Sequence, residues 1–131
     1  MEPSDNHSIA KSWIAMHLAG SGTKVYEENF WAFEKLDDLI HKDPHRALEI
    51  IKAIIKADSS ELILSNLGAG QIEDLMCYND AAVIDDIQAE AEAEANLLFK
   101  KAMSSTWLDS SDTKHLERFY KIAGIQPPLD E

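Results

Sequence analysis

The chain has 131 residues, of which 45% are apolar, and this length supports one hydrophobic core and one domain. Five glycines and four prolines exclude a collagen-like or low-complexity chain, and the single cysteine excludes an intramolecular disulfide framework. Acids number 24 against 12 lysines and arginines, so the net charge is −12.

Apolar residues recur at helical spacing through the first half of the chain. The spacing predicts a helix over 8–18, which the glycines of Gly20-Ser21-Gly22 end, and a second helix over 27–42. Asp43 then reads as a cap, and Pro44 as the first residue of a third helix, where its missing N–H costs nothing.

The second half is predicted as four further helices, over 60–67, 71–78, 80–101 and 113–123. We expect Gly68-Ala69-Gly70 to end the first of them, and Asn79 or Asp80 to cap the long third one. No segment alternates apolar and polar residues as a half-buried strand would. The sequence therefore predicts an all-α fold.

The predicted organisation is a single compact domain of about six to seven helices over 8–124. A flexible N-terminus at 1–7 and a tail at 125–131 flank it. Displacing the chain by 36 residues aligns the apolar stripes that follow Asp43 and Asn79, which is the period of HEAT- or TPR-like helical hairpins. Two unrelated amphipathic helices are the other interpretation of this alignment.

The first residues, MEPSDNHS, lack the basic start and apolar stretch of a signal peptide. No uncharged run approaches the roughly 18 residues that a membrane helix needs. We therefore expect a cytoplasmic protein, in which Cys77 is a buried structural thiol.

The negative charge is concentrated between Lys56 and Lys100, where the chain has ten acids and no base. Such a surface disfavours direct binding of nucleic acid or of an anionic membrane, because both carry negative phosphates. It fits a basic protein partner, which the field would attract and orient. The alternative is that the acids serve only solubility.

No catalytic, cofactor-binding or metal-binding motif is recognisable. His41 and His45 have the spacing of two metal ligands on one helix, but Pro44 between them places them on different elements. Glu90 and Glu94 lie one turn apart, and such a pair on an acidic helix is ordinarily solvated. We therefore predict no catalytic, cofactor or metal residues.

The predicted partner-binding residues are Asp85, Asp86, Glu90 and Glu94 on the acidic helix, together with Trp107 in the polar break that follows it. The two glutamates fall near the edge of the apolar face, where a partner could desolvate them. An exposed tryptophan is a common anchor of protein interfaces. The alternative for Trp107 is that it closes the core beside a helix end.

Several segments carry a family resemblance. They are Trp13-Ile14 with His17, FWAFEKLDDLIHKDPHRALEIIKAI at 30–54, NLGAGQIEDLM at 66–76, and Val83-Ile84-Asp85. Together they resemble a bacterial family of small uncharacterised all-helical proteins, known as a domain of unknown function, over residues 9–107. The resemblance implies a helical fold and assigns no activity. It draws attention to Gly70, expected to end a helix, and to Glu73 and Asp74 in the first turn of the next.

With no catalytic constellation, the leading hypothesis is a non-enzymatic acidic binding protein. We expect an immunity- or antitoxin-type inhibitor that neutralises a basic, nuclease-type protein, because the cleft of such an enzyme is itself basic. One alternative is a helical-repeat adaptor or scaffold whose acidity only keeps it in solution. The other is an enzyme with an unrecognised carboxylate or histidine site.

Overall fold

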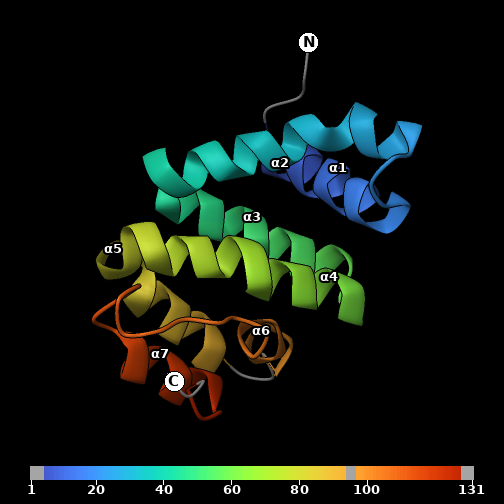
Figure 1. Cartoon of the computed structure of the whole chain (residues 1–131). Helices are drawn as coiled ribbons and strands as arrows, with labels where there is room; N and C mark the ends of the chain where they lie inside the picture. Colours follow the sequence, from blue (N-terminus) through green and yellow to red (C-terminus); the bar gives the residue numbers. More distant parts are fainter. Residues whose placement is uncertain (1–4, 94–96, 128–131) are drawn as a thin grey trace.

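The computed structural model describes residues 5–93 and 97–127, and no strand occurs in these ranges (Figure 1). The predicted all-α fold is therefore confirmed. The elements in chain order are α1 (Asn6–Ala19), α2 (Lys24–Lys42), α3 (Pro44–Ala57), α4 (Glu61–Asn66), the π-helix η1 (Leu67–Ile72), α5 (Glu73–Glu92), α6 (Leu97–Met103) and α7 (Leu116–Ala123).

Side chains cap the first turns of α1, α2 and α3. Asp5, Thr23 and Asp43 each accept a hydrogen bond from a backbone N–H of the turn that follows. The Asp43 carboxylate lies 3.3 Å from the backbone nitrogen of Arg46, and Pro44 is the first helical residue. The predicted start of the third helix is therefore confirmed, and it rests on local chemistry alone.

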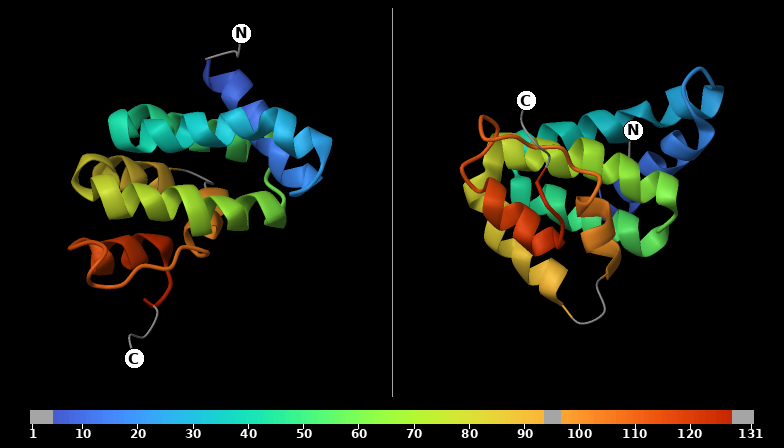
Figure 2. Two further views of the ribbon diagram at one scale, coloured as in Figure 1. Left: turned by 45° about the horizontal axis from the view of Figure 1, so that its top comes forward. Right: turned by 60° about the horizontal axis from the view of Figure 1, so that its bottom comes forward.

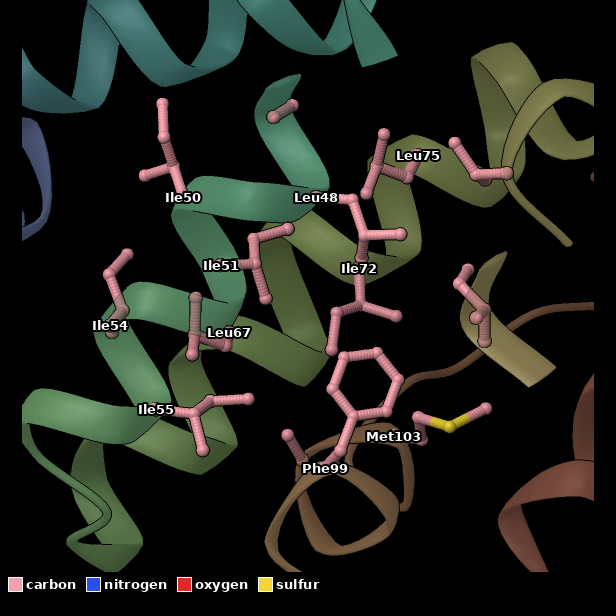
Figure 3. Close-up of a cluster of buried hydrophobic side chains, with 14 of the residues drawn as sticks. Leu48, Ile50, Ile51, Ile54, Ile55, Leu67, Ile72, Leu75, Phe99 and Met103 are labelled. Carbon is pink, nitrogen blue, oxygen red and sulfur yellow. The ribbon is translucent and has the colours of Figure 1, made fainter. Parts of the chain in front are cut away.

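The core is centred on α3, whose isoleucines Ile50, Ile51 and Ile54 have no exposed surface. Figure 3 shows side chains of the following helices gathered against this face, among them Leu67 of η1 and Phe99 of α6. Burial of this apolar surface is the main favourable term in folding, and it joins all the elements into one compact domain.

The glycines of Gly68-Ala69-Gly70 do not end a helix, contrary to the prediction. α4, η1 and α5 follow one another without a break, and the chain passes through this motif as a π-helix. A Cβ at Gly68 would overlap the backbone carbonyl oxygen of Ala102 in α6. The glycine therefore serves a close approach between two helices, and the wider π-turn accommodates it.

The predicted division of the chain at Asn79 is present as a kink, whereas the continuous helix predicted over 80–101 is wrong at its C-terminal end. Asn79 has φ −145° and ψ 40°, so α5 bends there, and its side-chain amide donates to the Ile40 carbonyl oxygen at 2.7 Å. The helix begins one turn and a half before this bend, at Glu73. The boundary expected at Asn79 is therefore a kink within α5, at which the Asn79 side chain is bonded to α2.

α5 ends at Glu92, and α6 begins at Leu97. Ala93 leaves the helical region with ψ 145°. In α6 the Leu98 side chain is 42% exposed, whereas Phe99 is buried. Helix propensity favours continuation through the Ala- and Glu-rich stretch, but α5 ends at Glu92, and the separate helix α6 buries Phe99 in the core.

The helices form successive tiers, with α1 and α2 on one side, α3 to α5 in the middle and α6 and α7 on the other (Figures 1 and 2). The stretch 104–115, drawn in orange, runs along the first half of α5 in each of these views. α2 flanks that half of α5 on its other side. This arrangement brings distant parts of the sequence to one face.

Candidate functional site

A groove of about 610 Å³ lies between α3, α5 and α6, with Ile55 and Phe99 in its apolar lining. Its central charged group is Lys52, whose Nζ lies 2.8 Å from Oε1 of Glu49 and 3.7 Å from Oε1 of Glu90. Two lysines and two glutamates line the groove. Because these charges balance, the groove offers no charge selectivity toward a ligand.

Asp85, a predicted partner-binding residue, forms an ion pair within the protein. Nη2 of Arg118 in α7 donates to its carboxylate at 2.6 Å. The same guanidinium donates to Oε1 of Gln88 from Nε at 3.0 Å and from Nη2 at 2.7 Å. The Asp85 side chain is 84% exposed, but its charge is directed toward α7.

The other predicted acids of α5 also have basic neighbours. Oδ2 of Asp86 lies 2.9 Å from Nδ1 of His45 in α3. Glu90 is the most buried of these acids, and its carboxylate lies beside the ammonium of Lys52. Glu94 lies outside the described residues. Asp85, Asp86 and Glu90 of α5 thus lie against basic groups of α3 and α7.

Trp107 is 64% exposed, although Thr106 before it and Leu108 after it are buried. Its backbone N–H donates to Oε1 of Glu73 at 2.9 Å. The hydroxyl of Tyr120 donates to the Thr106 carbonyl oxygen at 2.7 Å and accepts the Leu108 N–H at 2.9 Å. The backbone on both sides of Trp107 is therefore fixed while the indole faces solvent, so it does not close the core.

Carboxylates gather around the first turn of α5, where Glu73 contacts the backbone of Trp107. Burial raises the pKa of Glu73, and the charges of Asp74 and Asp112 raise it further against the lowering effect of the backbone hydrogen bond it accepts. Burial, followed by the charge of Asp37, likewise raises the pKa of Asp74, which His41 only partly offsets. In the described part of the chain, these four acids form no salt bridge with a lysine or arginine.

Tyr78 is the second exposed aromatic residue of this face, at 62% exposure. It lies one helical turn after Asp74, and its ring centroid is 4.4 Å from that of His41 in α2. The sequence prediction missed it. We call the set of exposed aromatic rings and nearby acids the aromatic–acidic surface: Asp37, Glu73, Asp74, Tyr78, Trp107 and Asp112.

Cys77 lies beside this surface and is half-buried rather than fully buried. Burial and the neighbouring carboxylates, that of Asp112 foremost, raise the pKa of its thiol to about 11. The thiol is therefore protonated at neutral pH and is a poor nucleophile.

His41 and His45 lie on different helices, as the proline between them predicts. Across residues 5–93 and 97–127, no group of three or more His, Cys, Asp or Glu side chains is placed to hold a metal ion. None of the helices described is both long enough and apolar enough to cross a membrane.

Comparison with known protein families gives a match over most of the chain. The family model described as "Family of unknown function (DUF6869)" matches residues 19–124. No curated protein and no solved structure matches the chain. The matched range contains the whole aromatic–acidic surface.

Proposed function

The chain belongs to this family of unknown function, and we propose from its own surface chemistry that it is a non-enzymatic protein that binds and neutralises a basic protein. The partner class that fits best is a nuclease-type toxin, and the role is that of an immunity protein or antitoxin. The observation that carries the proposal is the set of carboxylates on the aromatic–acidic surface, which form no salt bridge with Lys or Arg in the described residues.

Partial burial of these carboxylates favours their binding to a cation. Burial raises the pKa values of Glu73 and Asp74, so each ionised side chain costs free energy in the unbound protein. A lysine or arginine of a partner would offset that cost by direct pairing. Nucleic acid would meet like charge at the same place.

The proposed contact surface is the first half of α5 rather than its second half. Asp85, Asp86 and Glu90 already lie against basic groups of the protein itself. These three acids are still part of the net charge of −12, and so they contribute to the long-range electrostatic field that steers a basic partner. Direct pairing with that partner belongs to Glu73 and Asp74.

The proposal is tested with a double variant, Glu73→Gln with Asp74→Asn, which removes two charges and keeps the side-chain shapes. The control, Glu28→Gln with Glu61→Gln, makes the same charge change on exposed residues of α2 and α4. Each immobilised protein is exposed to a lysate of the source organism, and retained proteins are purified and titrated.

We expect the parent and the control to retain a basic protein that the double variant loses, with a Kd that weakens as salt is raised. Purified partner should also lose its own activity when the parent protein is added. The proposal is wrong if no basic protein is retained, or if the double variant binds the retained protein as tightly as the parent.

A further inference from the structure

The indole of Trp107 is exposed, whereas hydrogen bonds fix the backbone around it at several points. The hydroxyl of Thr106 donates to the Gly68 carbonyl oxygen at 2.7 Å, and the Thr106 carbonyl oxygen accepts the Tyr120 hydroxyl at 2.7 Å. Trp107 itself is held through its N–H by Glu73. A partner would therefore pay little conformational entropy to order this loop.

The fold itself gains little from this indole. Thr106 and Leu108 supply the buried contacts of the segment, and the exposed Trp107 ring leaves apolar area in water, where a short polar side chain would cost less. Large aromatic residues that are rigidly presented in this way are typical anchors of protein interfaces.

A second aromatic anchor lies across the first turns of α5. Glu73 contacts the Trp107 loop, while Asp74 lies toward α2, where Tyr78 packs against His41. Figure 1 shows the same order, with the 104–115 stretch on one side of this helix and α2 on the other. Two exposed rings thus flank two half-buried carboxylates.

Building on the proposed function, we propose that Trp107 and Tyr78 are preformed anchors for an arginine-bearing segment of the basic partner. A guanidinium can stack on an aromatic ring and donate paired hydrogen bonds to a carboxylate at the same time. A lysine ammonium is a more strongly hydrated point charge and lacks the planar stacking face.

Charge excludes the other occupants of this surface. A second copy of the chain also carries −12, and a two-fold dimer formed through this surface would place carboxylates against carboxylates. Single-stranded nucleic acid stacks on exposed aromatic rings, but such sites also need a positive groove along the backbone. The aromatic–acidic surface has the aromatic rings, but its charge is negative where a nucleic-acid site needs positive charge.

The test uses three synthetic peptides of one sequence, in which every basic position is arginine, lysine or the neutral arginine isostere citrulline. Each is titrated into the whole protein by calorimetry, and the indole N–H of Trp107 is followed by NMR. We expect the arginine peptide to bind several-fold more tightly than the lysine peptide, and the citrulline peptide not to bind.

Replacement of the anchors should remove this preference. Trp107→Ala is expected to weaken arginine-peptide binding by about tenfold and to make the arginine and lysine peptides equivalent. Trp107→Phe keeps a ring and should retain part of the preference, as should Tyr78→Phe. Leu18→Ala removes an exposed apolar side chain from α1 and serves as the control, with binding unchanged. Thermal melts of all four variants should match the parent.

The anchor proposal is overturned if the arginine peptide fails to bind, if Trp107→Ala binds it as well as the parent, or if arginine and lysine peptides bind equally. These outcomes are separate from failure of the proposed function. A basic protein that depends on Glu73 and Asp74 but binds Trp107→Ala normally would leave the function standing and remove the anchors.

Discussion

Glu73 and Trp107 are 34 positions apart in the sequence, and the carboxylate of the first accepts the backbone N–H of the second at 2.9 Å. This bond joins the first turn of α5 to the 104–115 stretch. The residues on both sides of Trp107 are buried, so the bond adds a further fixed point to the backbone that carries the exposed indole. Glu73 therefore holds the loop and contributes charge to the same face.

Replacing Glu73 should separate these two roles. In Glu73→Ala the Trp107 N–H loses its acceptor, and we expect a loss of about 1 kcal/mol in the free energy of unfolding, with faster exchange of that amide. Glu73→Gln keeps an acceptor oxygen and should stay closer to the parent in both measurements. Equal amide protection in the alanine and glutamine variants would contradict the role assigned to this bond.

Gly68 and Gly70 offer a matched pair within the π-helix. Gly68→Ala would drive its Cβ into the backbone of α6, so we expect the free energy of unfolding to fall by about 3 kcal/mol, or the variant to fail to fold. Gly70→Ala meets no atom within 4 Å and has no positive φ, so it should raise stability by about 0.5–1 kcal/mol. Denaturant melts compare them, and equal effects would refute the close contact at Gly68.

The sequence predicts most of the helices because their signals are local. The cap and proline at Asp43 and Pro44 and the apolar stripe of α3 lie within one short segment, and the structure follows them. The role of Gly68 could not be predicted in this way. Its constraint comes from Ala102 in a distant helix, and a local reading sees only a helix-ending glycine.

The candidate site likewise has features that local sequence predicts and features that depend on tertiary contacts. Tyr78 could have been predicted as exposed, since it falls off the apolar stripe formed by Ile72, Leu75 and Met76. The basic partners of the acidic helix could not be predicted. Asp86 and His45 are 41 positions apart, and only the packing of α5 on α3 brings them together.

The environment of His17 leads us to expect that the free energy of unfolding falls in acid. Its ring stacks on Trp13 with centroids 3.7 Å apart, and burial lowers its pKa against the raising effect of its bond to the Trp13 carbonyl oxygen. As pH falls, the unfolded state takes up the proton first, near pH ~6.5. Stability that is present above that pH is therefore lost as the pH falls through the lower folded pKa.

The variant His17→Phe keeps an aromatic ring and does not titrate. We expect its free energy of unfolding to fall less between pH ~7 and ~5 than that of the parent, measured by urea melts at each pH. A parent and variant with parallel pH profiles would show that His17 does not contribute to the acid sensitivity.

The ion pair between Asp85 and Arg118 predicts that charge reversal on the acidic helix affects the fold as well as any partner. Asp85→Lys places an ammonium against the guanidinium that also binds Gln88, so α7 loses part of its attachment to α5. The pair is largely exposed, and we expect a loss of only about 1 kcal/mol at low salt. Thermal melts at low and high salt measure it, and the loss should shrink as salt screens the repulsion.

A charge swap gives the decisive comparison. Asp85→Lys combined with Arg118→Glu restores opposite charges at the same two positions, although Arg118→Glu alone also gives up the bonds to Gln88. The double variant should therefore be more stable than the sum of the two single effects, with the difference largest at low salt. Simple additivity at every salt concentration would mean that the charge of Asp85 is not engaged by α7. It would then be free for a partner, and the contact surface would extend to Asp85 in the second half of α5.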